Sequence, residues 1–209
     1  MNWSDFNDNA DYKEDFLSYK QKIKEIYFER RKLTNLYESE YNNFISEIFS
    51  DFKELLKENK LEVYDREEHS ISGQVNGNTV LQLFMELGYI GEPLVLVRYK
   101  NGNAECVDLF ITQDKKFDVI TEYIGPAHFD SDGNILINKD ITESEEFYEN
   151  YIKKYKANYE KIKKLFEFNG KEYKLLDLNL RIQLRYKDNN KGEYTNGRDA
   201  INKAVECFE

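Results

Sequence analysis

The fold is decided by residues 69–86, which read HSISGQVNGNTVLQLFME. Two runs suited to strands, 69–75 and 79–86, flank the tripeptide Asn76-Gly77-Asn78. Asn-Gly readily adopts the positive φ angles of a tight hairpin turn. The segment therefore predicts a β-hairpin, whose tight turn makes the two strands antiparallel neighbours.

The same pattern continues along the chain to residue 138. Residues 94–99 form a continuous apolar run, which is typical of a strand covered on both faces. A second Asn-Gly-Asn at 101–103 leads into residues 104–112, and further short turns lead to runs at 117–124 and 135–138. Such turns leave no room for a crossover, so we expect an antiparallel meander of five or six strands.

The segment before this meander is helical in pattern. Residues 12–56 contain neither Gly nor Pro, and apolar residues recur at steps of three and four. Arg30 interrupts the apolar stripe, so the stripe is not a clean coiled-coil heptad. One unbroken helix would be about 70 Å long. We favour two packed helices broken at Asn42-Asn43 over one long helix that pairs with a second copy as a coiled coil.

The segment after the meander predicts a helix, a β-hairpin and a short terminal helix. A capping box formed by Thr142 and Glu145 opens the first helix, which we expect to run to about Leu165. Asn169-Gly170 then turns residues 165–168 against 173–186, and residues 196–208 form the last helix. The chain is therefore expected to be α+β, with a helical segment over 1–60, packed on or extending from the core, and an α+β domain over 61–209.

Composition and charge limit the classes of function. The chain has 40 acidic and 30 basic residues, a formal net charge of −10, which disfavours binding to nucleic acid or to an anionic membrane. The two cysteines, Cys106 and Cys207, are far apart and are expected to be reduced thiols, with Cys106 buried. No signal peptide and no apolar run of about 20 residues is visible, so we expect a soluble cytoplasmic protein.

Acidic residues within the expected strands are the candidates for catalysis. Asp108 lies on one strand, and Asp118 and Glu122 lie on the next. If their faces coincide, the three carboxylates could hold a metal ion or act as acid and base, as in a metal-dependent hydrolase or nuclease. The lysine that such nucleases place two residues after the glutamate is missing here, because Ile124 occupies that position. The catalytic cluster is therefore the second choice, and a solvated sheet face is the first.

A calcium-like sequence and the two histidines predict no metal site. Residues 128–135 keep the spacing of a calcium loop around Gly133, but His128 and Lys139 stand where oxygen ligands are required. We therefore predict an Asp132-Gly133 hairpin turn there. His69 and His128 are too few for a histidine-rich zinc site, and no cofactor-binding motif occurs.

The leading hypothesis is a protein that acts by binding another protein, without catalysis. No catalytic motif is complete, and an acidic surface steers association with a basic partner. Such a module would be of the inhibitor, immunity or phage counter-defence type. A structural homodimer joined through the N-terminal helices is a further alternative. The candidate binding residues are a basic strand row and helix tyrosines, the residue type favoured at hot spots: Arg181, Arg185, Lys187, Tyr12, Tyr19, Tyr37 and Tyr41.

Overall fold

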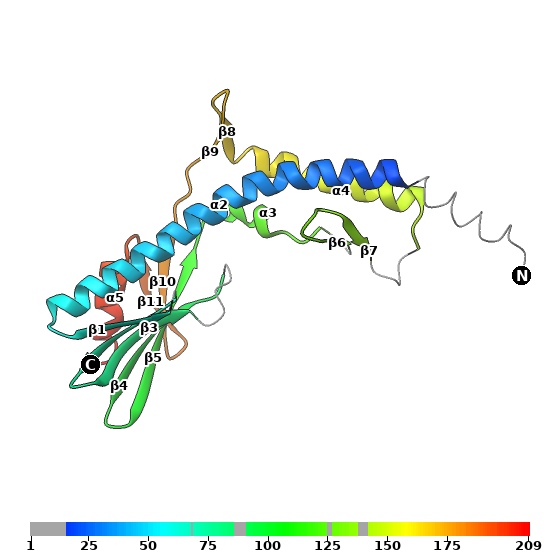
Figure 1. The fold of residues 1–209 in the computed structure, drawn as a ribbon. Helices are drawn as coiled ribbons and strands as arrows, with labels where there is room; N and C mark the ends of the chain where they lie inside the picture. Colours follow the sequence, from blue (N-terminus) through cyan, green and yellow to red (C-terminus); the bar gives the residue numbers. More distant parts are fainter. Residues whose placement is uncertain (1–15, 68, 86–90, 125–126, 138–141) are drawn as a thin grey trace, which may run out of the picture. The chain divides into compact units, whose positions relative to one another are not determined.

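The computed structural model describes residues 16–67, 69–85, 91–124, 127–137 and 142–209 and confirms the α+β class (Figure 1). The chain forms two compact units. Unit 1 comprises residues 1–37 and 115–176, and unit 2 comprises residues 38–114 and 177–209. Whether residues 61–209 form a domain of their own stays a prediction.

One helix, α2 (Leu17–Glu58), replaces the two packed helices that we favoured. It runs through Asn42-Asn43 without a break, because Asn lowers helix propensity only slightly and the buried stripe continues from Tyr41 to Ile45 and Ile48. At 1.5 Å per residue, its 42 residues span about 63 Å. A helix of this length does not have to pack on a single domain. Its residues up to Tyr37 belong to unit 1, and those from Glu38 belong to unit 2.

Unit 2 is built on a seven-stranded antiparallel sheet. The meander from residue 70 to residue 112 is confirmed, and both Asn-Gly turns have the expected positive φ angles at Asn76, Gly77, Asn101 and Gly102. The strand order is β1-β2-β3-β4-β5-β10-β11. The strand bounds are β1 Glu62–Glu67, β2 Ser70–Val75, β3 Asn78–Met85, β4 Leu94–Lys100, β5 Asn103–Thr112, β10 Arg181–Tyr186 and β11 Asn189–Tyr194.

The prediction of a strand over residues 117–124 is wrong. These residues belong to unit 1 and form a 3-10 turn, η1 (Lys115–Phe117), followed by a short helix, α3 (Asp118–Thr121). Phe117 and Ile120 are the buried residues, and their three-residue spacing suits a helical turn. The place beside β5 is taken by β10, which the chain supplies 69 residues later by pairing Arg181 with Thr112.

Two helices cover one face of the unit 2 sheet. Leu83, Leu96 and Leu109 point to this covered face and are fully buried. Residues of α2 reach it, since a Cβ added at Gly73 would lie 2.5 Å from Leu56 Cδ2. The C-terminal helix α5 (Gly197–Glu206) packs beside β10 and β11 (Figure 1). Apolar burial between the sheet and these helices forms the core of unit 2.

Unit 1 pairs the first half of α2 with α4 (Glu145–Lys163). Ser144 caps α4 by accepting a hydrogen bond from Phe147 N, so the helix begins slightly after the expected Thr142. Stacked rings fill the space between the helices, with Tyr19 and Phe16 of the α2 side against Tyr148. Two hairpins complete the unit: β6 (Ala127–Phe129) with β7 (Ile135–Ile137), and β8 (Phe166–Phe168) with β9 (Tyr173–Leu175).

Arg30, which interrupts the apolar stripe of α2, anchors α3 within unit 1. Its Nε donates a hydrogen bond to Asn158 Oδ1 at 3.0 Å, and its Nη2 donates to the carbonyl of Ile120 at 2.8 Å. Asn158 of α4 is only 4 % exposed and donates through Nδ2 to the carbonyl of Val119 and to Glu122 Oε2. The polar residues therefore replace apolar packing with a hydrogen-bonded network that joins α2, α3 and α4.

Candidate functional site

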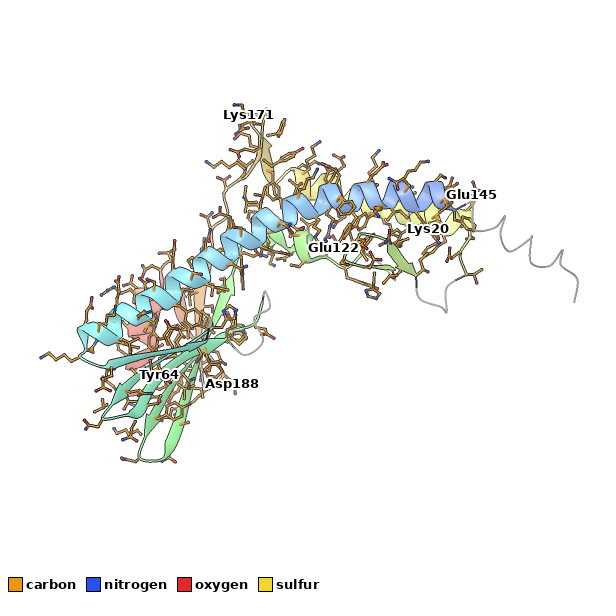
Figure 2. All side chains as sticks on the ribbon, in the orientation of Figure 1. Lys20, Tyr64, Glu122, Glu145, Lys171 and Asp188 are labelled. Atoms are coloured by element: carbon orange, nitrogen blue, oxygen red, sulfur yellow. The ribbon has the colours of Figure 1, made fainter. Side chains whose placement is uncertain are left out.

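The second face of the unit 2 sheet carries the most extensive candidate surface. We call it the open face. Its side chains alternate with those of the covered face along each strand. Tyr64 and Tyr99 remain 43 % and 40 % exposed on it. It comprises Tyr64, Gln82, Phe84, Val95, Val97, Tyr99, Cys106, Asp108, Phe110, Arg181, Gln183 and Arg185, which the strand register places side by side. Figure 2 labels Tyr64 on this sheet.

On β5 and β10, the open face places an arginine over an aromatic ring. The guanidinium of Arg185 lies 4.5 Å from the centroid of Phe110 and donates a hydrogen bond to Gln183 Oε1. Asp108 is the register partner of Arg185 across the two strands. Partial burial raises the pKa of the Asp108 carboxyl, and the charge of Arg185 opposes that rise. Phe110, Arg185 and Asp108 therefore group an aromatic ring, a cation and a carboxylate on this part of the face.

The predicted basic row is only partly a strand row. Arg181 and Arg185 lie on β10 and point to the open face, where Arg181 pairs with Glu193 Oε2 at 3.6 Å. Lys187 lies instead in the turn after β10, with φ +50°, and the next residue, Asp188, has φ +63° (Figure 2). These two positive φ angles form the tight turn between β10 and β11.

The predicted tyrosines have different surroundings. Tyr12 lies outside the described residues. Tyr19 donates a hydrogen bond to Glu145 Oε1 at 2.7 Å, and this bond raises the pKa of Tyr19 to about 12. Tyr37 and Tyr41 are buried, and the Tyr41 hydroxyl accepts a hydrogen bond from Gly91 N. The homodimer through these helices stays a prediction, which light scattering at high concentration tests.

The three predicted carboxylates do not share a sheet face. Asp108 lies on β5 in unit 2, whereas Asp118 begins α3 and Glu122 follows α3 in unit 1. Among the described residues, no three acidic, histidine or cysteine side chains are grouped so that they could hold a metal ion. Asp118 and Glu122 were assigned to a strand that does not form, and the strand geometry behind the cluster is therefore wrong.

Two smaller expectations concern Cys106 and the calcium-like sequence. Cys106 is exposed on the open face and not buried, because its position on β5 alternates with the buried Val107. The turn at Asp132-Gly133 is present. Asp130 Oδ1 accepts hydrogen bonds from the backbone N–H groups of Asp132 and Asn134, and the hydrogen bonds from Asn134 lower the pKa of the Asp130 carboxyl.

A polar groove of about 660 Å³ lies elsewhere in unit 2, between α2 and the first strands. His69 lines it together with Ser46 and Asp65. These residue types could form a nucleophile, base and orienting acid, but the bonds shown are different. The Ser46 hydroxyl donates back to the carbonyl of Asn42, and Asp65 pairs with Lys53 at 2.8 Å. The groove therefore has the residue types but not the hydrogen bonds of a hydrolytic triad.

Charge is distributed unevenly between the units. Unit 2 contains 21 acidic and 12 basic residues, a net charge of −9, whereas unit 1 contains 19 acidic and 18 basic residues. Almost the whole excess of negative charge therefore belongs to the unit that carries the open face. Residue totals for the complete sequence could not show this, because each unit is assembled from two separate segments.

The rings of the open face were missed at the level of sequence. Tyr64, Tyr99 and Phe110 lie on three different strands, and no local motif connects them. Only Phe110 has an available signal, the alternation of side chains along β5, by which it shares a face with Cys106 and Asp108.

No protein-family model matches the chain, and comparison with curated proteins and with solved structures found no match. Within the described residues, no helix has the length and apolar character needed to cross a membrane.

Proposed function

We propose that the protein acts by binding another protein through the open face of unit 2, without catalysing a reaction. The observation that carries the proposal is the combination, in one unit, of a net charge of −9 and a sheet face with exposed aromatic rings. The partner presents a basic surface. This mode of action is that of an inhibitor, immunity or counter-defence protein.

The composition of the open face supports this proposal. Tyrosine and arginine are the residues most enriched at energetic hot spots of interfaces. Tyr64, Tyr99 and Arg185 supply these groups on a rigid sheet, and Phe110 gives apolar contact beside Arg185. Tyr99 donates a hydrogen bond to Gln82 and Arg185 to Gln183, so their side chains are held in place before a partner arrives.

The surrounding charge supports a basic partner. A net charge of −9 raises the rate of encounter with a positive surface and lowers the rate with a negative one. Arg181 is neutralised by Glu193 at 3.6 Å, so β10 does not add a free cation at that position. Arg185 lies opposite Asp108 in the strand register, so its planar guanidinium can serve as an anchor without adding net charge to the face.

The experiment is affinity capture from a native lysate with the full chain and two matched variants. One variant, Tyr64→Ser with Tyr99→Ser, removes both exposed rings of the open face. The control, Tyr123→Ser, removes a tyrosine of unit 1 that is 69 % exposed. We expect a stoichiometric partner with a high isoelectric point that the wild type and the control retain and the double variant loses.

The captured protein is then purified and its affinity is measured by calorimetry at two salt concentrations. Removal of two hot-spot rings is expected to weaken binding by about 2–4 kcal/mol. Added salt should weaken it further, because opposite charges are screened. The proposal is overturned if no stoichiometric partner is recovered, or if the partner binds the double variant as tightly as the wild type.

A further inference from the structure

A dense group of exposed lysines occupies one part of unit 1. We call it the lysine cluster. Residues 150–176 contain eight lysines and three acidic residues, Glu160, Glu167 and Glu172. All eight lysines are exposed, and the salt bridges found among the described residues include none of them. The cluster comprises Lys153, Lys154, Lys156, Lys161, Lys163, Lys164, Lys171 and Lys174.

The α4 lysines lie on the solvent side of that helix. Its opposite face buries Tyr151, Tyr155, Asn158 and Ile162 at steps of three and four, which leaves the remaining surface to lysine. In unit 2, by contrast, Lys53, Arg98, Arg181, Arg198 and Lys203 each pair with a carboxylate. The cluster therefore keeps a local positive charge that the chain does not itself neutralise.

Exposed aromatic rings accompany the lysines at two places. At the first, Tyr123 lines a pocket of about 290 Å³ with Lys154 and Lys161. Glu122 also lines it and accepts a hydrogen bond from Asn158, so the lining includes two lysines and one glutamate. Tyr123 is 69 % exposed. The pocket thus combines an accessible ring with a net positive wall.

The second place is the hairpin formed by β8 and β9. Phe168 is 55 % exposed, and its ring centroid lies 4.9 Å from that of Tyr173, its register partner. Lys174 is the register partner of Glu167 in the same ladder, and Lys171 lies in the turn that closes the hairpin (Figure 2). A ring and a lysine therefore lie together here as well.

We propose that the lysine cluster binds single-stranded nucleic acid. Proteins that bind single strands combine a positive surface along the backbone with rings on which unpaired bases stack. Lysines supply the phosphate contacts, and Tyr123 and Phe168 supply the stacking surfaces. An acidic protein would be attracted by the same charge, and the binding of a single strand in the test below distinguishes the two partners.

The net charge of the whole chain does not oppose this binding as strongly as the sequence suggested. Charges act over about 10 Å at moderate ionic strength. Unit 1 carries a net charge of only −1, and the lysine cluster within it has an excess of five positive charges. The proposal is independent of the open face, which belongs to unit 2.

Fluorescence anisotropy with the full chain tests the proposal. The probe is a labelled single strand of about 15 deoxythymidylates, a length near the site size of single-strand binding folds. We expect saturable binding whose affinity falls as salt rises from about 50 to about 200 mM, because bound phosphates release counterions. A duplex of the same length should bind at least about tenfold more weakly, because its bases cannot stack on the rings.

Three variants separate charge from stacking. Lys154→Gln with Lys161→Gln should weaken binding about tenfold and reduce the salt dependence. Tyr123→Ser and Phe168→Ser should each weaken binding about fivefold or more and leave the salt dependence unchanged. The control, Lys57→Gln with Lys100→Gln, removes two exposed lysines of unit 2 and should change affinity less than about twofold.

The inference is overturned by any of three results. The first is absence of saturable binding at low salt. The second is equal loss in the control and the cluster variants, which would indicate non-specific charge. The third is a pair of results found together, which would indicate a general polyanion site. In it, the duplex or heparin binds as tightly as the single strand, and neither Phe168→Ser nor Tyr123→Ser weakens binding. Circular dichroism of each variant shows that loss of binding is not loss of fold.

Discussion

Replacing Asn158 by alanine should destabilise unit 1, because this buried side chain joins three elements. The change removes the acceptor of the Arg30 Nε hydrogen bond and the donor to the Val119 carbonyl. A hydrogen bond to a charged group contributes about 1.5–3 kcal/mol, and a neutral one contributes about 1 kcal/mol. The bond to Glu122 adds little, since that carboxylate is exposed. We therefore expect a loss of about 3 kcal/mol.

The loss is measured by thermal and urea unfolding of the full chain. In a chain of this size, about 3 kcal/mol corresponds to a fall in Tm of about 6–12 °C. Hydrogen exchange should locate the effect in α3, because Asn158 and Arg30 hold the carbonyls of Val119 and Ile120. The control is Asn150→Ala, at an exposed position of α4, which should change stability by less than about 0.5 kcal/mol.

A double-mutant cycle tests the reasoning itself. If the cost arises from an unpaired guanidinium, Arg30→Met combined with Asn158→Leu should cost clearly less than the sum of the single changes. Additive effects of the two substitutions would refute the network. A loss below about 1 kcal/mol for Asn158→Ala would refute it as well, because the partly buried Arg30 would lose a hydrogen-bond partner and the hydrogen bond to the Val119 carbonyl would be lost too.

Three further predictions concern a turn, a group of tyrosines and a helix end. Gly133→Ala should destabilise more than Gly170→Ala in urea unfolding: both glycines have positive φ, but only at Gly133 would the new Cβ lie 2.7 Å from Phe28 Cζ. Burial raises the pKa of Tyr148, Tyr151 and Tyr155, so these three keep their protons in the folded state, while unfolded tyrosines ionise near pH 10. Their contribution to stability is fully present below about pH 10 and should be lost as pH rises above it, and the part of the tyrosinate absorbance that these three supply should appear only on unfolding. Asp51→Ala should cost about 1 kcal/mol in thermal unfolding, because Asp51 Oδ2 accepts the Arg198 N–H in the first turn of α5 at 2.9 Å.

Local signals predicted most of the elements correctly. The two Asn-Gly turns determined the pairs β2–β3 and β4–β5, since each turn permits one kind of connection. The apolar stripe predicted the helical character of residues 17–58, but it could not distinguish one helix from two. Asn42-Asn43 is compatible with one helix or with two. Which of them forms depends on the distant residues that pack against each half of the segment.

The errors arose where structure depends on distant residues. Phe117–Val119–Thr121 alternates like a strand, but Phe117 and Ile120 are the two residues that unit 1 buries. β11 was missed because its residues, NNKGEY, are polar and because the turn before it uses Lys187 and Asp188 instead of glycine. Of the candidate site, Arg181 and Arg185 could be found from alternation, whereas Tyr64 and Tyr99 share a face with them only through pairing across the sheet.

The two units are interleaved along the chain, and this order affects how the protein can be made. Residues 38–114 leave the ribosome before residues 115–176 complete unit 1, and unit 2 must wait for residues 177–209. The edge of β5 that β10 will occupy is therefore without its partner during that interval. Such an edge invites pairing with other nascent chains. Slow translation should thus favour aggregation of this protein.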